Sequence, residues 1–417
     1  MKKLRNFAFI LIIGILIGTL SMALVYALPK ERMRQNAQSS IDVFYTESVY
    51  PQQVQGYKST QLDNETEAIM LLGAIYDGGD YSILQQAMRV ARITFRDASS
   101  NCVALIKYLW ENKIPEGTID YTRYWHGYML YLKPLLLLMD YADIRMLNMM
   151  LHVTLLLVLI KEFILRKLTK YMFPFAMSLI VLNPAAAAMS LQFSSIYYLV
   201  LISMILILKN HAQWSEKKRY PYVFFILGML TVFFDFLTYP MAALCMPLIL
   251  VLILENQSTE QHWLQTMKDI IIAGVCFVSG YVGMWAGKWM ISSLILQENI
   301  FVDAINQFTV HTGNTVIEGE AITKMGALFR NIRVISRWPY VFVLGGYFIF
   351  SCLNIDWKNI RNSIFKVIPF FCVSIVPLAW ICVTSSHASW CYWYTYRGFM
   401  ATVFGGFCIL KILPQRK

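Results

Sequence analysis

The chain has 417 residues, of which 57% are hydrophobic and only 15% carry a charge. An average soluble domain has about 25% charged residues, so this composition leaves too little polar surface to cover a soluble globule of this size. It excludes a cytosolic enzyme, a disordered protein and a small disulfide scaffold. The composition and the mean hydropathy of +0.51 predict a membrane protein with several spans. The net charge of +11 is then first a signal of topology.

The first expected span covers residues 7–28 and follows a basic N-terminus. A bilayer core of about 30 Å needs roughly 20 apolar residues in one helix, and this segment supplies them. A cleaved signal peptide is the alternative. The apolar stretch is about twice as long as the core of an ordinary signal peptide, and Pro29–Arg32 is a poor cleavage sequence. A retained anchor is therefore the favoured interpretation.

Residues 29–145 contain no stretch that predicts an ordinary span. Apolar residues recur with helical spacing over 66–76, 81–95 and 101–111, which predicts three helices. They would lie on the membrane interface or form a small helical cap on the bundle. The apolar stretch 128–139 is too short to cross the membrane and is expected to be a re-entrant or interfacial helix.

Apolar density returns after this loop and stays high to the end of the chain. With residues 7–28, the total is about ten spans. The fold class predicted is an all-α membrane protein with about ten transmembrane helices and a large helical first extracytoplasmic loop. The later spans are expected at residues 146–165, 171–189, 194–208, 221–239, 241–254, 270–290, 338–354, 367–385 and 399–413.

The distribution of Lys and Arg among the short loops predicts the orientation. Basic residues gather in the loops near 161–170, 209–219 and 358–366 and at the C-terminus, whereas the loops near 190–194 and 235–240 contain none. Because cytoplasmic loops carry the excess of Lys and Arg, both termini are expected in the cytoplasm of a multi-pass protein of the cell membrane. The resulting division of the chain is 1–28 (N-terminus and first span), 29–145 (outer loop), 146–290 (spans 2–7), 291–337 (outer loop) and 338–417 (spans 8–10 and C-terminus).

This topology limits the classes of partner. The basic clusters favour anionic membrane lipids, and no soluble basic face with interleaved aromatic residues predicts nucleic-acid binding. The chain has neither a G-x-x-x-x-G-K-[ST] nor a G-x-G-x-x-G sequence, which disfavours a cytoplasmic nucleotide site. The long segments 29–145 and 291–337 lie on the outer side, and the second is expected to be a mobile lid or an acceptor-binding loop. Chemistry is therefore expected at the outer face.

Acidic residues gather in the segment Asp63–Glu67, directly before an apolar run. Asp63 and Glu67 are four residues apart and would share one face of a helix. Two such carboxylates can divide the roles of base and orienting group, or they can bind a divalent cation through hard oxygen ligands. The alternative is structural: Asp63 or Asn64 would cap the helix, with acidic side chains at the positive end of its dipole.

Two further segments combine aromatic rings with cations. They are Tyr121–Tyr128, with Arg123 and His126, and Ser386–Arg397, with His387. Tyr and Trp are common at membrane interfaces, which is the structural interpretation. A simple aromatic belt does not need the cationic side chains, which can bind an anionic group such as a phosphate. The rings could also stack on a sugar.

Together, these three segments resemble those of the GT-C superfamily of membrane glycosyltransferases. Its members have a cytoplasmic N-terminus, a large first outer loop with interfacial helices and an acidic residue, and about ten spans. The chain also resembles a narrower bacterial family of multi-pass membrane proteins. That family has a D-N-x-T-D-like helix start, a Y-x-R-Y-W-H-G segment and an H-x-x-x-H-Y-W-F-T-Y-R-like segment. The matching segments here are Asp63–Glu67, Tyr121–Gly127 and His387–Arg397.

Two positions depart from the narrower pattern. Glu67 stands where an aspartate is usual, which keeps the carboxylate and lengthens the side chain. Cys391 stands where a second histidine is expected, so a role that needs both histidines is not carried over.

The resemblance implies the transfer of a sugar from a polyprenyl-phosphate carrier to a hydroxyl of a glycan or lipid acceptor, in the synthesis of cell-surface glycan. Asp63 or Glu67 would accept the proton of that hydroxyl. Cationic side chains would neutralise the leaving phosphate, and tryptophans would stack on the sugar or the carrier. No cofactor or metal is assigned, although a divalent cation would suit the two carboxylates. The residues expected to bind the phosphate or the sugar are Arg123, Trp125, His126, His387, Trp393 and Arg397.

Other functions remain open from the sequence. A polysaccharide polymerase or ligase also uses lipid-linked sugars, and outer loops rich in arginine without a required carboxylate would favour it. A flippase or transporter would show two symmetric halves with broken helices and charges near the midplane. A scaffold without catalytic activity is the remaining alternative.

Overall fold

Helices make up nearly all of the regular structure in the computed structural model, which describes residues 2–256, 263–313, 315–317 and 319–416. Two short antiparallel pairs of strands are the exceptions in these ranges: β1 (Arg92–Thr94) pairs with β2 (Gly117–Ile119), and β3 (Thr315–Ile317) pairs with β4 (Glu320–Ile322). The expectation of a helical membrane protein is thus confirmed in its coarse form.

Among the residues that the structure describes, five helices are long and apolar enough to cross a membrane. A sixth span is counted if α16 (Lys324–Ile335) and α17 (Trp338–Leu353) are taken together, although they are bent by 87° at their junction. The count of about ten spans stays a prediction, because the other apolar helices are shorter than a bilayer crossing needs. The five long helices are α1 (Lys2–Tyr26), α8 (Tyr141–Leu165), α11 (Leu191–Glu216), α14 (Trp263–Leu296) and α18 (Ile364–Val383).

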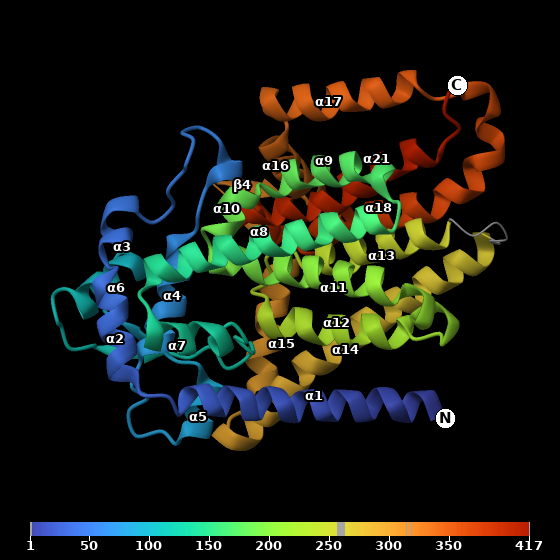
Figure 1. Ribbon diagram of the computed structural model, residues 1–417. Helices are drawn as coiled ribbons and strands as arrows, with labels where there is room; N and C mark the ends of the chain where they lie inside the picture. Colours follow the sequence, from blue (N-terminus) through green and yellow to red (C-terminus); the bar gives the residue numbers. More distant parts are fainter. Residues whose placement is uncertain (1, 257–262, 314, 318, 417) are drawn as a thin grey trace.

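Shorter apolar helices complete the bundle. Figure 1 shows that most bundle helices run along one common direction and that the two chain ends lie at the same end of the bundle. Every residue of α13 from Met241 to Ile253 is buried, so this helix forms the centre of the core. The shorter helices are α9 (Met172–Leu182), α10 (Pro184–Ala188), α12 (Tyr220–Phe234), α13 (Met241–Glu255) and α21 (Phe399–Ile412).

The outside of the bundle is strongly apolar. Large hydrophobic side chains are exposed along α1, α8, α14 and α17. An apolar surface of this extent is typical of a protein that faces lipid. Inside, α12 and α14 approach closely at two glycines: a Cβ atom at Gly228 would lie 2.0 Å from the carbonyl oxygen of Phe277, and one at Gly280 would lie 2.0 Å from that of Phe225. Small residues of this kind let helix backbones meet in membranes.

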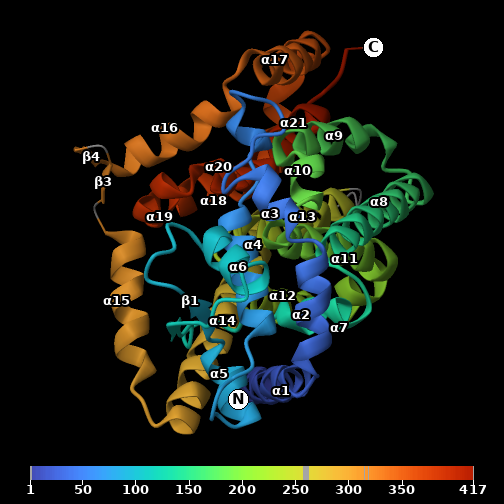
Figure 2. The same cartoon turned by 90° about the vertical axis from the view of Figure 1, so that its left-hand side faces the viewer.

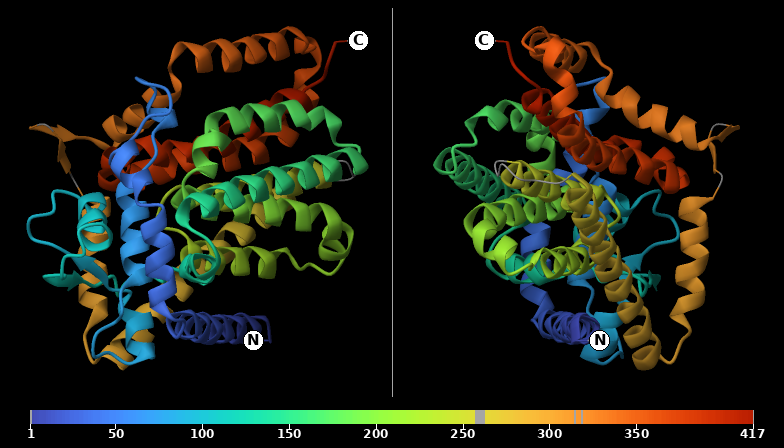
Figure 3. Two further views of the ribbon diagram at one scale, coloured as in Figure 1. Left: turned by 60° about the vertical axis from the view of Figure 1, so that its left-hand side comes forward. Right: turned by 90° about the vertical axis from the view of Figure 1, so that its right-hand side faces the viewer.

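The first loop forms a cap at the end of the bundle away from the termini, which we call the cap end (Figures 1 and 3). The helices predicted at 66–76 and 101–111 are confirmed. The helix predicted at 81–95 is much shorter, because Val90 takes a left-handed φ of 46° and the chain then enters β1. The helices of this cap are α2 (Lys30–Ser39), α3 (Asp42–Glu47), α4 (Asn64–Ile75), α5 (Ile83–Arg89), α6 (Asn101–Leu109) and α7 (Met129–Leu138).

Two later segments join the cap end. The segment 291–337, expected as a lid or an acceptor loop, contains α15 (Ile300–Thr312), the β3–β4 hairpin and α16. The segment between α18 and α21 forms α19 (Ser385–Trp390), α20 (Tyr392–Thr395) and the short 3-10 helix η4 (Tyr396–Gly398). Figure 2 looks at this end and shows α15, α16 and α19 beside the helices of the first loop. The short helix η1 (Lys58–Thr60) contacts both α16 and α20.

Candidate functional site

Asp63 caps the N-terminus of α4, as the structural interpretation of its segment predicts. One carboxylate oxygen accepts a hydrogen bond from the backbone N–H of Thr66 at 3.0 Å, and the other accepts one from the Thr66 hydroxyl at 3.1 Å. The side chain is buried. Burial raises the pKa of Asp63 to about 7, although the two hydrogen bonds from Thr66 act in the opposite direction. Asp63 therefore gains and loses a proton near neutral pH.

The groups around Asp63 come from two distant parts of the chain. Burial raises the pKa of Tyr50 and that of Tyr394, and the charge of Asp63 adds to both shifts. Burial also raises the pKa of the Cys391 thiol to about 12, again with a contribution from Asp63. The acidic segment of the first loop and the aromatic segment before the last helix therefore meet at Asp63.

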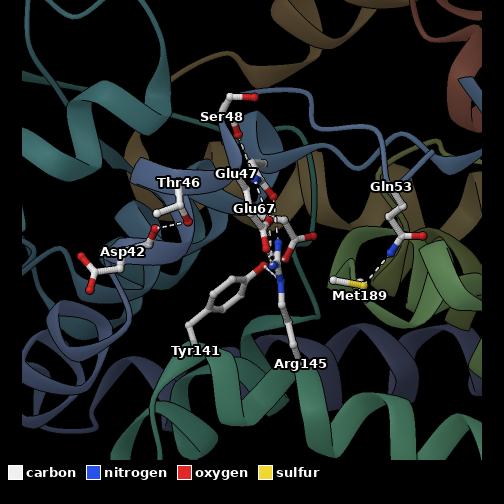
Figure 4. A network of polar contacts seen from close by, with 10 residues as sticks. Asp42, Thr46, Glu47, Ser48, Gln53, Glu67, Tyr141, Arg145 and Met189 are labelled. Atoms are coloured by element: carbon white, nitrogen blue, oxygen red, sulfur yellow. Dashed lines mark hydrogen bonds and ion pairs between the residues drawn. The ribbon is translucent and has the colours of Figure 1, made fainter. Parts of the chain in front are cut away.

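Glu67 lies in a different environment, although it is only one helical turn from Asp63. One of its carboxylate oxygens accepts hydrogen bonds from the Ser190 hydroxyl at 2.8 Å and from the backbone N–H of Gln192 at 2.9 Å. The other accepts one from the Tyr141 hydroxyl at 2.6 Å (Figure 4). These three donors satisfy the buried carboxylate and tie α4 to the starts of α8 and α11. Glu67 thus has a structural position, and it does not pair with Asp63 to form a two-carboxylate cation site.

Arg145 extends this network toward the surface of the cap. It forms an ion pair with Glu47, with distances of 2.8 and 2.9 Å, and it donates to the side-chain oxygen of Asn64 at 2.8 Å. Its Nε atom also donates to the Tyr141 hydroxyl at 3.2 Å. The guanidinium therefore donates through all three of its nitrogen atoms and holds the first turn of α4. Figure 4 shows the contacts converging from α3, α4 and α8. This network fixes the backbone that presents Asp63.

The segment Tyr121–Tyr128 divides into a buried part and a part that faces α15. Trp125 is fully buried, donates its indole N–H to the carbonyl of Met284 at 2.8 Å and packs on Phe233. No face of this ring is open to a sugar in the observed arrangement. His126 is also buried, and its Nε2 atom has no hydrogen-bond partner in the described residues.

Burial, followed by the positive charge of Lys288, lowers the pKa of His126 well below its usual value. The imidazole is therefore neutral and gives no positive charge for binding a phosphate. It packs edge-on against Tyr121, Tyr128 and Phe236.

The other part of this segment binds α15. Arg123 forms an ion pair with Asp303 at 3.0 Å, and the Tyr124 hydroxyl lies 3.3 Å from Nε2 of His311. The His311 ring packs edge-on against that of His387, with 5.1 Å between the centroids. Nε2 of His387 lies 2.9 Å from the carbonyl oxygen of Leu237, so this nitrogen carries the hydrogen.

A chain of polar contacts thus runs from the first loop through α15 to α19. Arg123, Tyr124 and His311 line a cavity of only about 30 Å³, which has room for little more than one water molecule. In this arrangement α15 covers the cationic part of the site.

Arg397 is fully buried and does not face open space. It donates to three backbone carbonyls: that of Trp393 at 2.7 Å, that of Leu182 at 3.2 Å and that of Ser59 at 3.3 Å. Its guanidinium also stacks over the ring of Phe193. Arg397 therefore joins η1, the end of α9 and α20, and it has a structural position in the core.

Trp393 is the predicted sugar-stacking residue that keeps a partly open position. Its ring is half-buried and meets the edge of the Tyr50 ring at a centroid distance of 5.3 Å. Its indole N–H is buried and has no partner in the described residues, and the same is true of the Ser59 hydroxyl. These two atoms lie on η1 and α20, which contact each other, and both are free to bond to a ligand or to water.

Sequence reasoning did not single out several residues that shape the site. Arg145 and Tyr141 lie in what looked like an ordinary helix start, and His311 was one polar residue among many in a long loop. Their roles depend on contacts between residues more than seventy positions apart. Within the described residues, no group of three or more His, Cys, Asp or Glu side chains could hold a metal ion.

No protein-family model matches the chain, and neither a curated protein nor a solved structure is significantly similar to it.

Proposed function

We propose that the chain is an integral membrane glycosyltransferase that moves a sugar from a polyprenyl-phosphate carrier to an acceptor hydroxyl at the outer face of the cell membrane. The observation that carries the proposal is Asp63, a buried carboxyl with a pKa of about 7. Its charge acts on Tyr50, whose ring contacts that of Trp393. A general base works best when its pKa is close to the working pH, and Asp63 meets that condition.

The proposed reaction uses Asp63 as the base. The ionised carboxylate of Asp63 accepts the proton of the acceptor hydroxyl as its oxygen forms a bond to the anomeric carbon of the sugar. The bond between that carbon and the phosphate oxygen breaks, and its electron pair leaves with the lipid phosphate. A single displacement of this kind inverts the configuration at the anomeric carbon. The Asp63 proton then passes to solvent when the products leave.

The remaining residues have supporting roles in this proposal. Trp393 and Tyr50 provide the aromatic surface for the sugar, because their rings meet at the partly open side of the site. Arg123 and His387 lie under α15, so their contact with a substrate requires α15 to move away. Glu67 and Arg397 hold the framework. The orientation, with the cap end outside, rests on the charge pattern of the loops.

The test is transfer activity in proteoliposomes, with a panel of radiolabelled sugars on polyprenyl phosphate as donors. Asp63→Asn should lower transfer by at least about a hundredfold, since general-base catalysis contributes roughly 10²–10⁴. Asp42→Asn changes an exposed aspartate of the same loop and should leave transfer unchanged. Full activity of Asp63→Asn, or no transfer from any donor by the unaltered protein, would refute the proposal.

A further inference from the structure

α16 lies across the cap end of the molecule. It meets α17 at 87°, and Figure 2 shows α17 nearly end-on while α16 crosses the view. α17 is apolar and exposes large side chains such as Phe342 and Phe348 along its length, as a lipid-facing helix does. If α17 follows the membrane normal, then α16 must lie close to the plane of the membrane surface.

One face of α16 is fixed to the wall of the candidate site. Ala327, Asn331 and Val334 are buried on this face. The Asn331 amide donates to the carbonyl of Ala388 at 2.9 Å, and its oxygen accepts a hydrogen bond from the Thr395 hydroxyl at 2.7 Å. α16 therefore packs on α19 and α20, the two helices that carry His387 and Trp393.

The other face combines exposed apolar side chains with cations. Met325 and Phe329 are more than half exposed, and Lys324, Arg333 and Arg337 are exposed beside them. Hydrophobic side chains flanked by basic ones are typical of a helix at the boundary between lipid headgroups and acyl chains. Within the described residues, none of the cations of α16 forms an ion pair with a carboxylate.

Arg330 is the cation of α16 that lies nearest to the site. Its guanidinium stacks over the ring of Tyr392 at 4.6 Å, and its buried Nε atom has no hydrogen-bond partner in the part of the chain that the structure describes. A guanidinium oriented by an aromatic ring keeps its planar edge for two parallel hydrogen bonds to phosphate oxygens. Arg333 is three residues further along the helix, so the two cations are neighbours on its surface.

A row of aromatic rings connects Arg330 with Asp63. The rings of Tyr392 and Trp393 are 5.7 Å apart, and those of Trp393 and Tyr50 are 5.3 Å apart. The negative charge of Asp63 contributes to the raised pKa of Tyr50. A phosphate on α16 and a sugar beside Trp393 would therefore lie along one continuous path that ends at the proposed base.

We infer that Arg330 and Arg333 of α16 bind the phosphate of the lipid-linked donor, with its sugar directed along Tyr392 and Trp393 toward Asp63. This assignment rests on the proposed function. The lipid chain leaves the phosphate on the apolar side of α16 and enters the membrane beside α17. When the anomeric bond breaks, the two arginines neutralise the charge that develops on the leaving phosphate oxygen.

Binding of polyprenyl phosphate to the purified full chain, measured by native mass spectrometry from detergent micelles, tests the site without requiring turnover. The double variant Arg330→Gln/Arg333→Gln should bind at least tenfold more weakly than the unaltered protein. Lys358→Gln/Arg361→Gln removes two exposed cations at the opposite end of α17 and should bind normally. If the double variant does not fold, Arg333→Gln alone, which changes an exposed side chain, should still weaken binding measurably.

Phosphatidylglycerol provides the second arm of the experiment. It should displace polyprenyl phosphate only at large excess, and equal competition would show that α16 holds bulk anionic lipid instead of the donor. Normal carrier binding by the arginine variants overturns the inference and leaves the proposed function standing if Asp63→Asn still stops transfer. If the arginines are required for binding but no donor supports transfer, the proposed function fails and the lipid-phosphate site remains.

Discussion

Asp63 allows the proposed site to be tested through protein stability. Its pKa rises from 3.8 to about 7 on burial. Between these two values the folded chain holds a proton that the unfolded chain has released, so the free energy of unfolding falls as the pH rises. Each unit of pKa corresponds to about 1.36 kcal/mol, and the full penalty above pH 7 is therefore about 4 kcal/mol.

Asp63→Asn removes this penalty and keeps the helix cap, because asparagine caps as well as aspartate does. We expect the variant to be more stable than the unaltered protein at pH 8, by up to about 4 kcal/mol. The difference should widen by about 1.4 kcal/mol for each pH unit between pH 4 and pH 7 and then become constant. Reversible unfolding in mixed micelles, followed by tryptophan fluorescence across this pH range, measures it.

The control is Asp42→Asn, which also removes one negative charge but from an exposed position. A difference that does not change with pH, or an Asp63→Asn variant that is less stable than the unaltered protein at pH 8, would refute the reasoning. A gain in stability together with a loss of transfer would identify Asp63 as a strained functional group, since functional residues are often kept at a cost in stability.

Three further changes test the framework around the site. The Glu67 carboxylate accepts three hydrogen bonds, and in Glu67→Gln the amide NH2 group would face a donor that it cannot accept from. This change should lower the free energy of unfolding by about 1.5–3 kcal/mol. An unchanged unfolding midpoint would contradict the network. Gly280→Ala should destabilise the α12–α14 contact by about 1–3 kcal/mol. The control is Gly274→Ala, which has open space around its Cβ position and should be neutral or stabilising. Equal effects of the two changes would contradict the close approach of the helices. Asp303→Asn breaks the ion pair with Arg123 and should increase hydrogen exchange in α15. The cost in stability should be below about 1 kcal/mol, because Asp303 is partly exposed. Unaltered exchange would show that the ion pair does not hold α15 in place.

The sequence was sufficient for features that depend on neighbouring residues. The apolar composition predicted a helical membrane protein, and the pattern around Asp63 predicted a capped helix, because a cap involves residues only three positions apart. The helices near 66–76 and 101–111 were recognised for the same reason. The helix at 81–95 was overextended, because β1 forms only when Arg92–Thr94 meets Gly117–Ile119.

The site itself depended on distant contacts. The four-residue spacing of Asp63 and Glu67 suggested a pair of carboxylates that work together. Glu67 instead finds its donors in Tyr141, Ser190 and Gln192, which lie 74 to 125 positions away in the chain. Trp125 had the sequence context of a surface aromatic, yet it is buried because α12 and α14 close over it. No local pattern distinguishes a buried ring from an exposed one in such a segment.

The position of Arg397 has a consequence for the biogenesis of the protein. This side chain donates to the carbonyls of Ser59 and Leu182, which precede it in the chain by 338 and 215 residues. The contacts of the first loop with Arg397 therefore form only after the helices between them in the chain have been made. The surroundings of Asp63 are completed only when the segment that carries Arg397 has been made. A chain made only as far as α18 therefore lacks the hydrogen bonds by which Arg397 joins the first loop to the bundle.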